Sequence, residues 1–197
     1  MRGLNLVVLS KRLPFGIARR AYQLLVNYLL CLVSASFEAE TIESHTGSFL
    51  NLCETAASPG VIYLFLQNGY YPNREAYLAA WADATKREYE TIIAAGLDLQ
   101  LDCLDLALSR HMLFTDISND EFLKIAVTHV EALNHALSNV PEERVRIHIY
   151  WGNYEGPHVC DIPMSKMFDT LMSAKARYVL FETSNLRHGH EWTVFRD

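Results

Sequence analysis

The chain has 197 residues, of which 50% are hydrophobic and 20% are charged, so it can bury one sizeable core and is expected to form one main domain. Its formal net charge of -6 and isoelectric point near 5.7 argue against a nucleic-acid-binding surface, because phosphate binding requires clustered Lys and Arg. The cysteines, Cys31, Cys53, Cys103 and Cys160, show no Cys-x-x-Cys spacing, which indicates reduced thiols and a cytoplasmic protein rather than a disulfide framework or a zinc ribbon.

Residues 1–48 differ in pattern from the rest of the chain. The run 21–35 is apolar apart from Gln23 and Asn27, and it is shorter than the roughly 20 residues of a membrane span, so no membrane partner is expected. Basic residues before the run and small residues after it resemble a secretory signal. The helical spacing of its leucines favours an amphipathic helix that covers an incomplete barrel. A wrongly assigned gene start is a further interpretation.

From residue 49 onward, apolar runs of strand length alternate with helical stretches. Residues 49–53 are expected to form a strand that ends in a turn at 58–60, Ser-Pro-Gly. A helix then starts at Pro72 or Asn73 and is closed by Gly96.

The second half of the chain continues this alternation. Ser118 and Glu121 form a capping box at the start of a helix, and Pro141 stops it from continuing into the next strand. The remaining expected elements are a strand at 97–101, a helix at 118–137, a strand at 144–149, a helix at 165–174 and a strand at 179–181.

This order predicts an α/β fold with a parallel sheet. A complete (β/α)₈ barrel needs about 250 residues, so residues 49–197 supply about four or five of its eight units. We therefore expect a partial TIM barrel that follows an N-terminal helical extension, 1–48. Such a sheet has an unpaired edge on each side, which the N-terminal segment or a second copy in a homo-oligomer would cover.

The most informative segment is 146–158, in which a short apolar strand runs into a glycine-rich loop carrying His158. In parallel α/β proteins the carboxyl ends of the strands face the site, and the strand interiors pack in the core. Asp102, His148 and Glu182 each lie at the carboxyl end of a successive expected strand. We therefore expect these three side chains at one rim.

Four blocks, in the right order, resemble the cobalamin-independent methionine synthase family, in particular its short members related to the catalytic C-terminal domain and to epoxyalkane:coenzyme M transferases. The blocks are 56–62 (AASPGVI), 99–103 (LQLDC), 151–158 (WGNYEGPH) and 181–188 (FETSNLRH). The resemblance implies a zinc-dependent enzyme that transfers a methyl group from a methylfolate to a thiol such as homocysteine. Zinc would lower the pKa of the thiol, so that a thiolate attacks the methyl group.

Particular residues follow from this resemblance. The zinc motif His-x-Cys of the family falls on His148 and Tyr150, and its zinc-binding glutamate falls on Glu182. Its catalytic aspartate, which holds the amino group of homocysteine, falls on Asp102, and Ser58 in the first block is assigned to substrate binding. The partners expected are a small-molecule thiol and a methyl donor.

The sequence departs from the family pattern at two zinc ligands. Tyr150 stands where the family has a thiolate, and the last cysteine of the family would follow residue 197. Because two protein ligands seldom hold zinc against water, we expect weak zinc binding and slow turnover. A neutral phenol, whose pKa is about 10, is a poor zinc donor, so Tyr150 is expected to serve in packing. Cys160 could replace the thiolate if its loop folds back.

Each site residue also has a purely structural interpretation. His148 could be a hydrogen-bonded strand-end residue, Glu182 a solvated loop carboxylate and Asp102 a cap of the following loop. The alternative function is a non-catalytic half-barrel relative or fragment that binds a small molecule or a partner chain. A metal-assisted hydrolase is a third class, for which the sequence offers no general base.

Other chemically capable residues carry weaker patterns. Strand alternation turns Cys103 away from the side that Asp102 faces, so Cys103 is expected in the core. The resemblance places His188 and His190 in a pattern that the family shares outside its zinc set. The residues with no interpretable spacing, which we expect in packing or at the surface, are Tyr70, Tyr71, His111 and His129.

Overall fold

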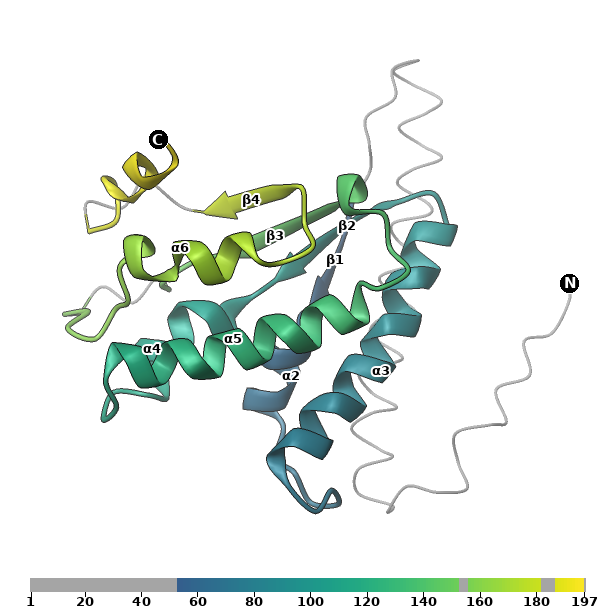
Figure 1. Ribbon diagram of the computed structural model, residues 1–197, viewed down its shortest axis with the longest axis horizontal. Coiled ribbons are helices and arrows are strands. Elements are labelled where there is room, and N and C mark those ends of the chain that lie inside the picture. The colour runs from purple at the N-terminus through teal and green to yellow at the C-terminus, as the bar shows by residue number, and fades with distance from the viewer. Residues whose placement is uncertain (1–52, 153–155, 182–186, 197) are drawn as a thin grey trace, which may run out of the picture. The chain divides into compact units, whose positions relative to one another are not determined.

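Four parallel strands form the sheet, and their order in space is their order in sequence. They are β1 (Cys53–Ala57), β2 (Asp98–Asp102), β3 (Val145–Ile149) and β4 (Tyr178–Phe181). The computed structural model describes residues 53–152, 156–181 and 187–196, and Figure 1 shows their arrangement. The chain divides into two units, 1–50 and 51–197, and all of the described residues belong to the second unit. The fold of this unit is α/β with a parallel sheet, as the sequence predicts.

Helices connect the strands, and shorter 3₁₀ helices complete the loops. The α-helices are α2 (Pro59–Phe65), α3 (Arg74–Ala94), α4 (Leu108–Met112), α5 (Asn119–Ala136) and α6 (Met164–Met172). The 3₁₀ helices are η1 (Leu104–Leu106), η2 (Glu142–Arg144) and η3 (Glu191–Phe195). The predicted capping box at the start of α5 is confirmed, because Ser118 Oγ accepts from the Glu121 amide and the Glu121 carboxylate accepts from the Ser118 amide.

The first βα connection differs from the sequence-based prediction. The structure has a strand at Cys53–Ala57, and of the strand expected at 49–53 only Cys53 lies within the described residues. The predicted turn at 58–60 is wrong, because these residues open helix α2. Ser58 Oγ accepts from the Val61 amide at 3.1 Å, and Pro59 occupies the first turn, where a missing N–H removes no helical hydrogen bond.

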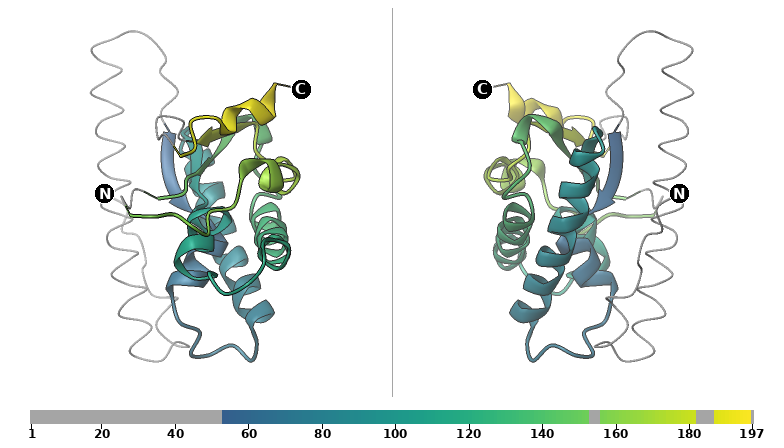
Figure 2. Two further views of the ribbon diagram at one scale, coloured as in Figure 1. Left: turned by 90° about the vertical axis from the view of Figure 1, so that its left-hand side faces the viewer. Right: turned by 90° about the vertical axis from the view of Figure 1, so that its right-hand side faces the viewer.

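One face of the sheet packs against α3, α5 and α6, which lie on the same side of it in Figures 1 and 2. The strand residues that point toward these helices are fully buried, and they contact helix residues such as Tyr89, Phe122 and Met167. Burying a large apolar side chain stabilises the fold by about 1.5 to 3 kcal/mol, so this face holds the unit together. Its fully buried strand residues are Leu99, Leu101, Val145, Ile147 and Ile149.

The other face carries the alternate residues of each strand. At its carboxyl end, the register places four residues in one row across the sheet, Ala57, Asp102, His148 and Leu180. These side chains are half-buried or exposed, and the described helices α3, α5 and α6 pack against the opposite face. We call this surface the open face.

Strands β1 and β4 flank the sheet, and neither has a further strand partner among the described residues. Within the same residues, every helix is too short or too polar to cross a membrane.

Candidate functional site

Asp102 and His148 lie side by side at the carboxyl ends of β2 and β3. The parallel register pairs the two residues directly, and His148 Nδ1 lies 2.8 Å from Asp102 Oδ1. The side chain of His148 is 28% exposed and that of Asp102 is 38% exposed, so both can reach a ligand from solvent. The structure therefore brings together two of the three side chains expected at the rim. We call them the strand-end pair.

The third expected rim residue, the proposed zinc ligand Glu182, lies outside the described residues. It follows β4, which ends at Phe181 beside Ile149 in the register. Cys160, the alternative source of a thiolate, is half-buried in the loop between β3 and α6.

Tyr150 packs against His148 of the strand-end pair. Its ring is stacked on the His148 imidazole, with the ring centroids 5.4 Å apart and the planes within 8° of parallel. A stacked phenol covers one face of the imidazole. The position that the resemblance assigns to a thiolate is thus occupied by an aromatic ring in packing contact.

Ser58 lies inside the protein rather than at the rim. It is 1% exposed, and its hydroxyl donates to Asp105 Oδ1 at 2.7 Å while accepting from the Val61 amide. These contacts engage the hydroxyl in capping α2. His129, which the sequence leaves uninterpreted, completes the arrangement with Nδ1 at 3.0 Å from Asp105 Oδ2.

This inner cluster of Ser58, Asp105 and His129 is packed tightly under helix α2. A methyl group at Gly60 would stand 2.0 Å from Asp105 Oδ2 and 2.6 Å from His129 Nδ1, so only glycine fits there. The aspartate stands between the serine and the histidine, each of which contacts a different carboxylate oxygen. The cluster therefore anchors the first βα loop rather than forming a nucleophile and base.

Cys103, next to Asp102, points into the core. Its side chain is fully buried, as strand alternation predicts, and burial followed by the nearby Asp105 raises the pKa of its thiol well above the ordinary value. A neutral thiol is a poor nucleophile and metal ligand. Cys103 therefore serves in packing.

A second polar group comes from the loops beyond the strand ends. His111, at the end of α4, and His158 and Asp161, between β3 and α6, each offer a ligand atom, and these atoms lie within 4.8 Å of one another. The two imidazoles are stacked with centroids 4.6 Å apart. We call these three residues the loop cluster.

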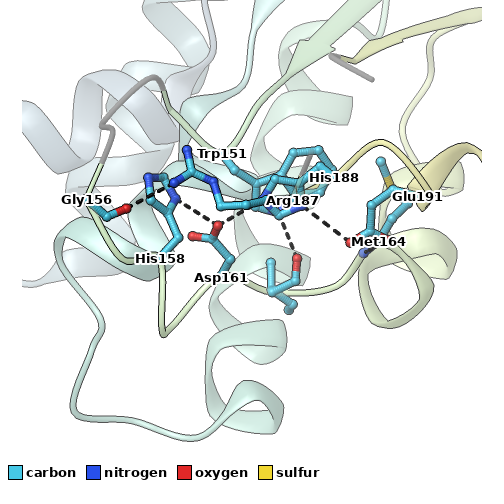
Figure 3. A network of polar contacts seen from close by, with 9 residues as sticks. Trp151, Gly156, His158, Asp161, Met164, Arg187, His188 and Glu191 are labelled. Atoms are coloured by element: carbon cyan, nitrogen blue, oxygen red, sulfur yellow. Dashed lines mark hydrogen bonds and ion pairs between the residues drawn. The ribbon is translucent and has the colours of Figure 1, made fainter. Parts of the chain in front are cut away.

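Asp161 is the centre of a buried hydrogen-bond network (Figure 3). Its Oδ2 atom lies 2.8 Å from His158 Nδ1 and 2.9 Å from His188 Nε2. His188 is stacked on Trp151, with centroids 4.2 Å apart, and its Nδ1 faces Glu191 Oε1 at 3.5 Å. These four histidine and carboxylate side chains thus hold the loop after β3 against the segment that leads into η3.

Sequence reasoning missed this network as a unit. The only local signal is the spacing of three between His158 and Asp161, and between His188 and Glu191. His111 comes from the preceding βα unit, so no sequence spacing connects it to the others. The fold alone brings the three segments together.

Comparison with known proteins adds no assignment: no family model, no curated protein and no solved structure matches the chain.

Proposed function

We propose that the chain is an S-methyltransferase of the cobalamin-independent methionine synthase type, which transfers a methyl group from a methylfolate to a thiol such as homocysteine. The observation that carries the proposal is the strand-end pair. Asp102, which the resemblance assigns to the substrate, and His148, which it assigns to zinc, stand in contact on the open face. Chemistry in parallel α/β folds is concentrated at these strand ends.

The sheet supports a partial TIM barrel as the scaffold. In a doubly wound fold the strand order reverses and helices cover both faces of the sheet. Here four strands follow in sequence order and α3, α5 and α6 pack on one face, which is the arrangement of consecutive barrel units. The open face would then line the barrel interior. A second copy that pairs with β1 or β4 would protect the edges of such a sheet.

The strand-end pair suits a substrate with an ammonium group and a soft sulfur atom. Asp102 Oδ1 contacts His148, and its other oxygen can accept from the ammonium group of an amino-acid thiol. The same carboxylate fixes the orientation of the imidazole and leaves Nε2 of His148 as the ring nitrogen for a further ligand. Asp102 would thus position both the substrate and the histidine.

The described residues do not complete a zinc site at His148. Tyr150 contributes a stacked ring in place of a thiolate, and Glu182 lies outside the described residues. A zinc site of the proposed kind needs three or four protein ligands. We therefore propose that the unmodified chain binds zinc weakly at this position and turns over slowly.

The stacked Tyr150 also favours the second candidate, a non-catalytic relative that binds a small thiol without turnover. Binding of the thiol would still require Asp102 in that case. The two candidates differ in product formation.

Methyl transfer from methyltetrahydrofolate to homocysteine tests the proposal, with the full chain assayed in the presence of zinc. We expect slow methionine formation by the unmodified chain, a rise of about 10-fold or more in Tyr150→Cys because a thiolate ligand is restored, and no rise in the matched variant Tyr150→Phe. Formation of methionine should be lost in His148→Ala.

An absence of methionine formation in Tyr150→Cys with zinc bound would support the non-catalytic candidate. Fast methylation by the unmodified chain with stoichiometric zinc would contradict the weak zinc site and would indicate Cys160 or a second subunit as the source of the ligand.

A further inference from the structure

We propose that the loop cluster, His111, His158 and Asp161, binds a divalent transition-metal ion such as zinc. This site is separate from the strand-end pair and does not rest on the proposed function. Two imidazoles and one carboxylate make a ligand set that zinc, iron and cobalt ions use in proteins, with further positions left for water or a ligand.

The spacing of the loop cluster suits an ion of this size. Metal–ligand distances of about 2.0 to 2.2 Å place the ligand atoms of one tetrahedral ion about 3.5 Å apart. The potential ligand atoms of the cluster already lie within 4.8 Å of one another. Because the two imidazoles are nearly parallel, one ring must rotate about its Cβ–Cγ bond to direct a nitrogen at the same point, and this torsion is broad in histidine.

Asp161 supplies a second, independent observation. Its side chain is only 8% exposed, and Oδ2 serves two histidines, whereas Oδ1 is buried with no hydrogen-bond partner in the part of the chain that the structure describes. Leaving a buried acceptor unpaired costs about 1 to 3 kcal/mol, and more when the group is charged. A cation bound by this carboxylate would remove the penalty.

The surrounding side chains hold the carboxylate as residues behind a metal ligand commonly do. His188 Nε2 donates to Asp161 Oδ2, and the imidazole is fixed by its stack on Trp151 (Figure 3). Glu191, 5% exposed, faces the other side of His188 and accepts from the Met164 amide at 3.0 Å. Such supporting contacts tune metal affinity by about 10-fold to 100-fold.

One neighbour opposes cation binding. Arg187 lies beside His158 in Figure 3, where its Nη1 donates to the Gly156 carbonyl at 3.0 Å. Its positive charge repels a metal ion, so we expect a lower affinity than in a structural zinc site.

Titration of the metal-free full chain with Co²⁺, followed by visible absorption, tests this site, since the ligand-field bands report coordination without any assay of activity. We expect one equivalent of Co²⁺ to bind and Zn²⁺ to displace it. His111→Gln should lower the Co²⁺ affinity on the order of 100-fold, since His111 is only half-buried and its loss should leave the fold intact. Asp161→Asn should lower it similarly.

The matched control is His135→Ala. His135 Nε2 also lies 2.7 Å from a carboxylate, Asp83 Oδ1, but both side chains are more than half exposed and the pair has no third ligand among the described residues. His135→Ala and His148→Ala should retain the Co²⁺ bands, and circular dichroism should confirm that each variant is folded. Absence of Co²⁺ binding to the unmodified chain, or unchanged binding in folded His111→Gln, would overturn the proposal. Loss of the bands in His148→Ala alone would also overturn it and would assign the ion to the strand-end pair.

Discussion

A contact between a histidine Nδ1 and an aspartate oxygen occurs both in the strand-end pair and in the loop cluster, where it joins His158 and Asp161. His148 and Asp102 are separated by 2.8 Å, as are His158 and Asp161. The first pair is 28% and 38% exposed, whereas the second is 1% and 8% exposed. An exposed pair contributes little to stability and stays accessible to ligands, whereas breaking a buried pair leaves a charge without compensation. Burial therefore separates a binding arrangement from one that also holds the loops together.

The difference in burial between the two pairs predicts the largest effect, a loss of stability on substitution of Asp161. Asp161→Asn should lower the free energy of unfolding by about 2 to 3 kcal/mol, because a neutral amide oxygen accepts from His158 and His188 more weakly than a carboxylate and the buried amide NH2 group is left without an acceptor. Asp102→Asn should lower it by less than about 1 kcal/mol. Urea denaturation of both variants at neutral pH measures the two values, and equal losses would show that burial does not distinguish the pairs.

Glu88, which belongs to neither the strand-end pair nor the loop cluster, makes the stability of the fold depend on pH. Burial, and then the Glu54 carboxylate, raises the pKa of Glu88 on α3 from 4.5 to about 7. The folded state thus holds a proton that the unfolded state releases, so this contribution is complete below pH 4.5 and is lost as the pH rises through about 7.

Glu88→Gln should therefore be more stable than the unmodified chain at pH 8, by about 1 to 2 kcal/mol, and should show a flatter dependence of stability on pH between 5 and 8. Thermal and urea unfolding across this range provide the test. An unchanged slope in Glu88→Gln would show that Glu88 does not carry the pH dependence of stability.

A smaller effect is expected on zinc binding at the strand-end pair. Tyr150→Cys should add a zinc-binding position at the strand-end pair and raise the zinc affinity there about 10-fold, because a thiolate replaces a stacked phenol. Zinc analysis after dialysis, performed in a His111→Gln background, counts this position alone. Equal zinc contents in Tyr150→Cys and Tyr150→Phe would contradict the expectation.

The sequence anticipates the strand-end pair because both residues end apolar strands, and parallel strands bring their carboxyl ends to one edge. It also anticipates the burial of Cys103, because successive side chains along a strand point to opposite faces of the sheet. The start of α2 cannot be told from a turn by its sequence, because Ser58 and Pro59 suit both a turn and a helix N-terminus. The loop cluster could not be predicted, since His111 and His158 meet only through the packing of two separate βα loops.

Homocysteine binding to the zinc-supplemented full chain, measured by titration calorimetry, tests most directly whether the strand-end pair is the reaction site. We predict that Asp102→Asn and His148→Ala each weaken binding about 10-fold or more, because a charged contact contributes about 1.5 to 3 kcal/mol, whereas His111→Gln leaves it unchanged. Binding that survives in Asp102→Asn and His148→Ala but is lost in His111→Gln would contradict the account and would move the substrate site to the loop cluster.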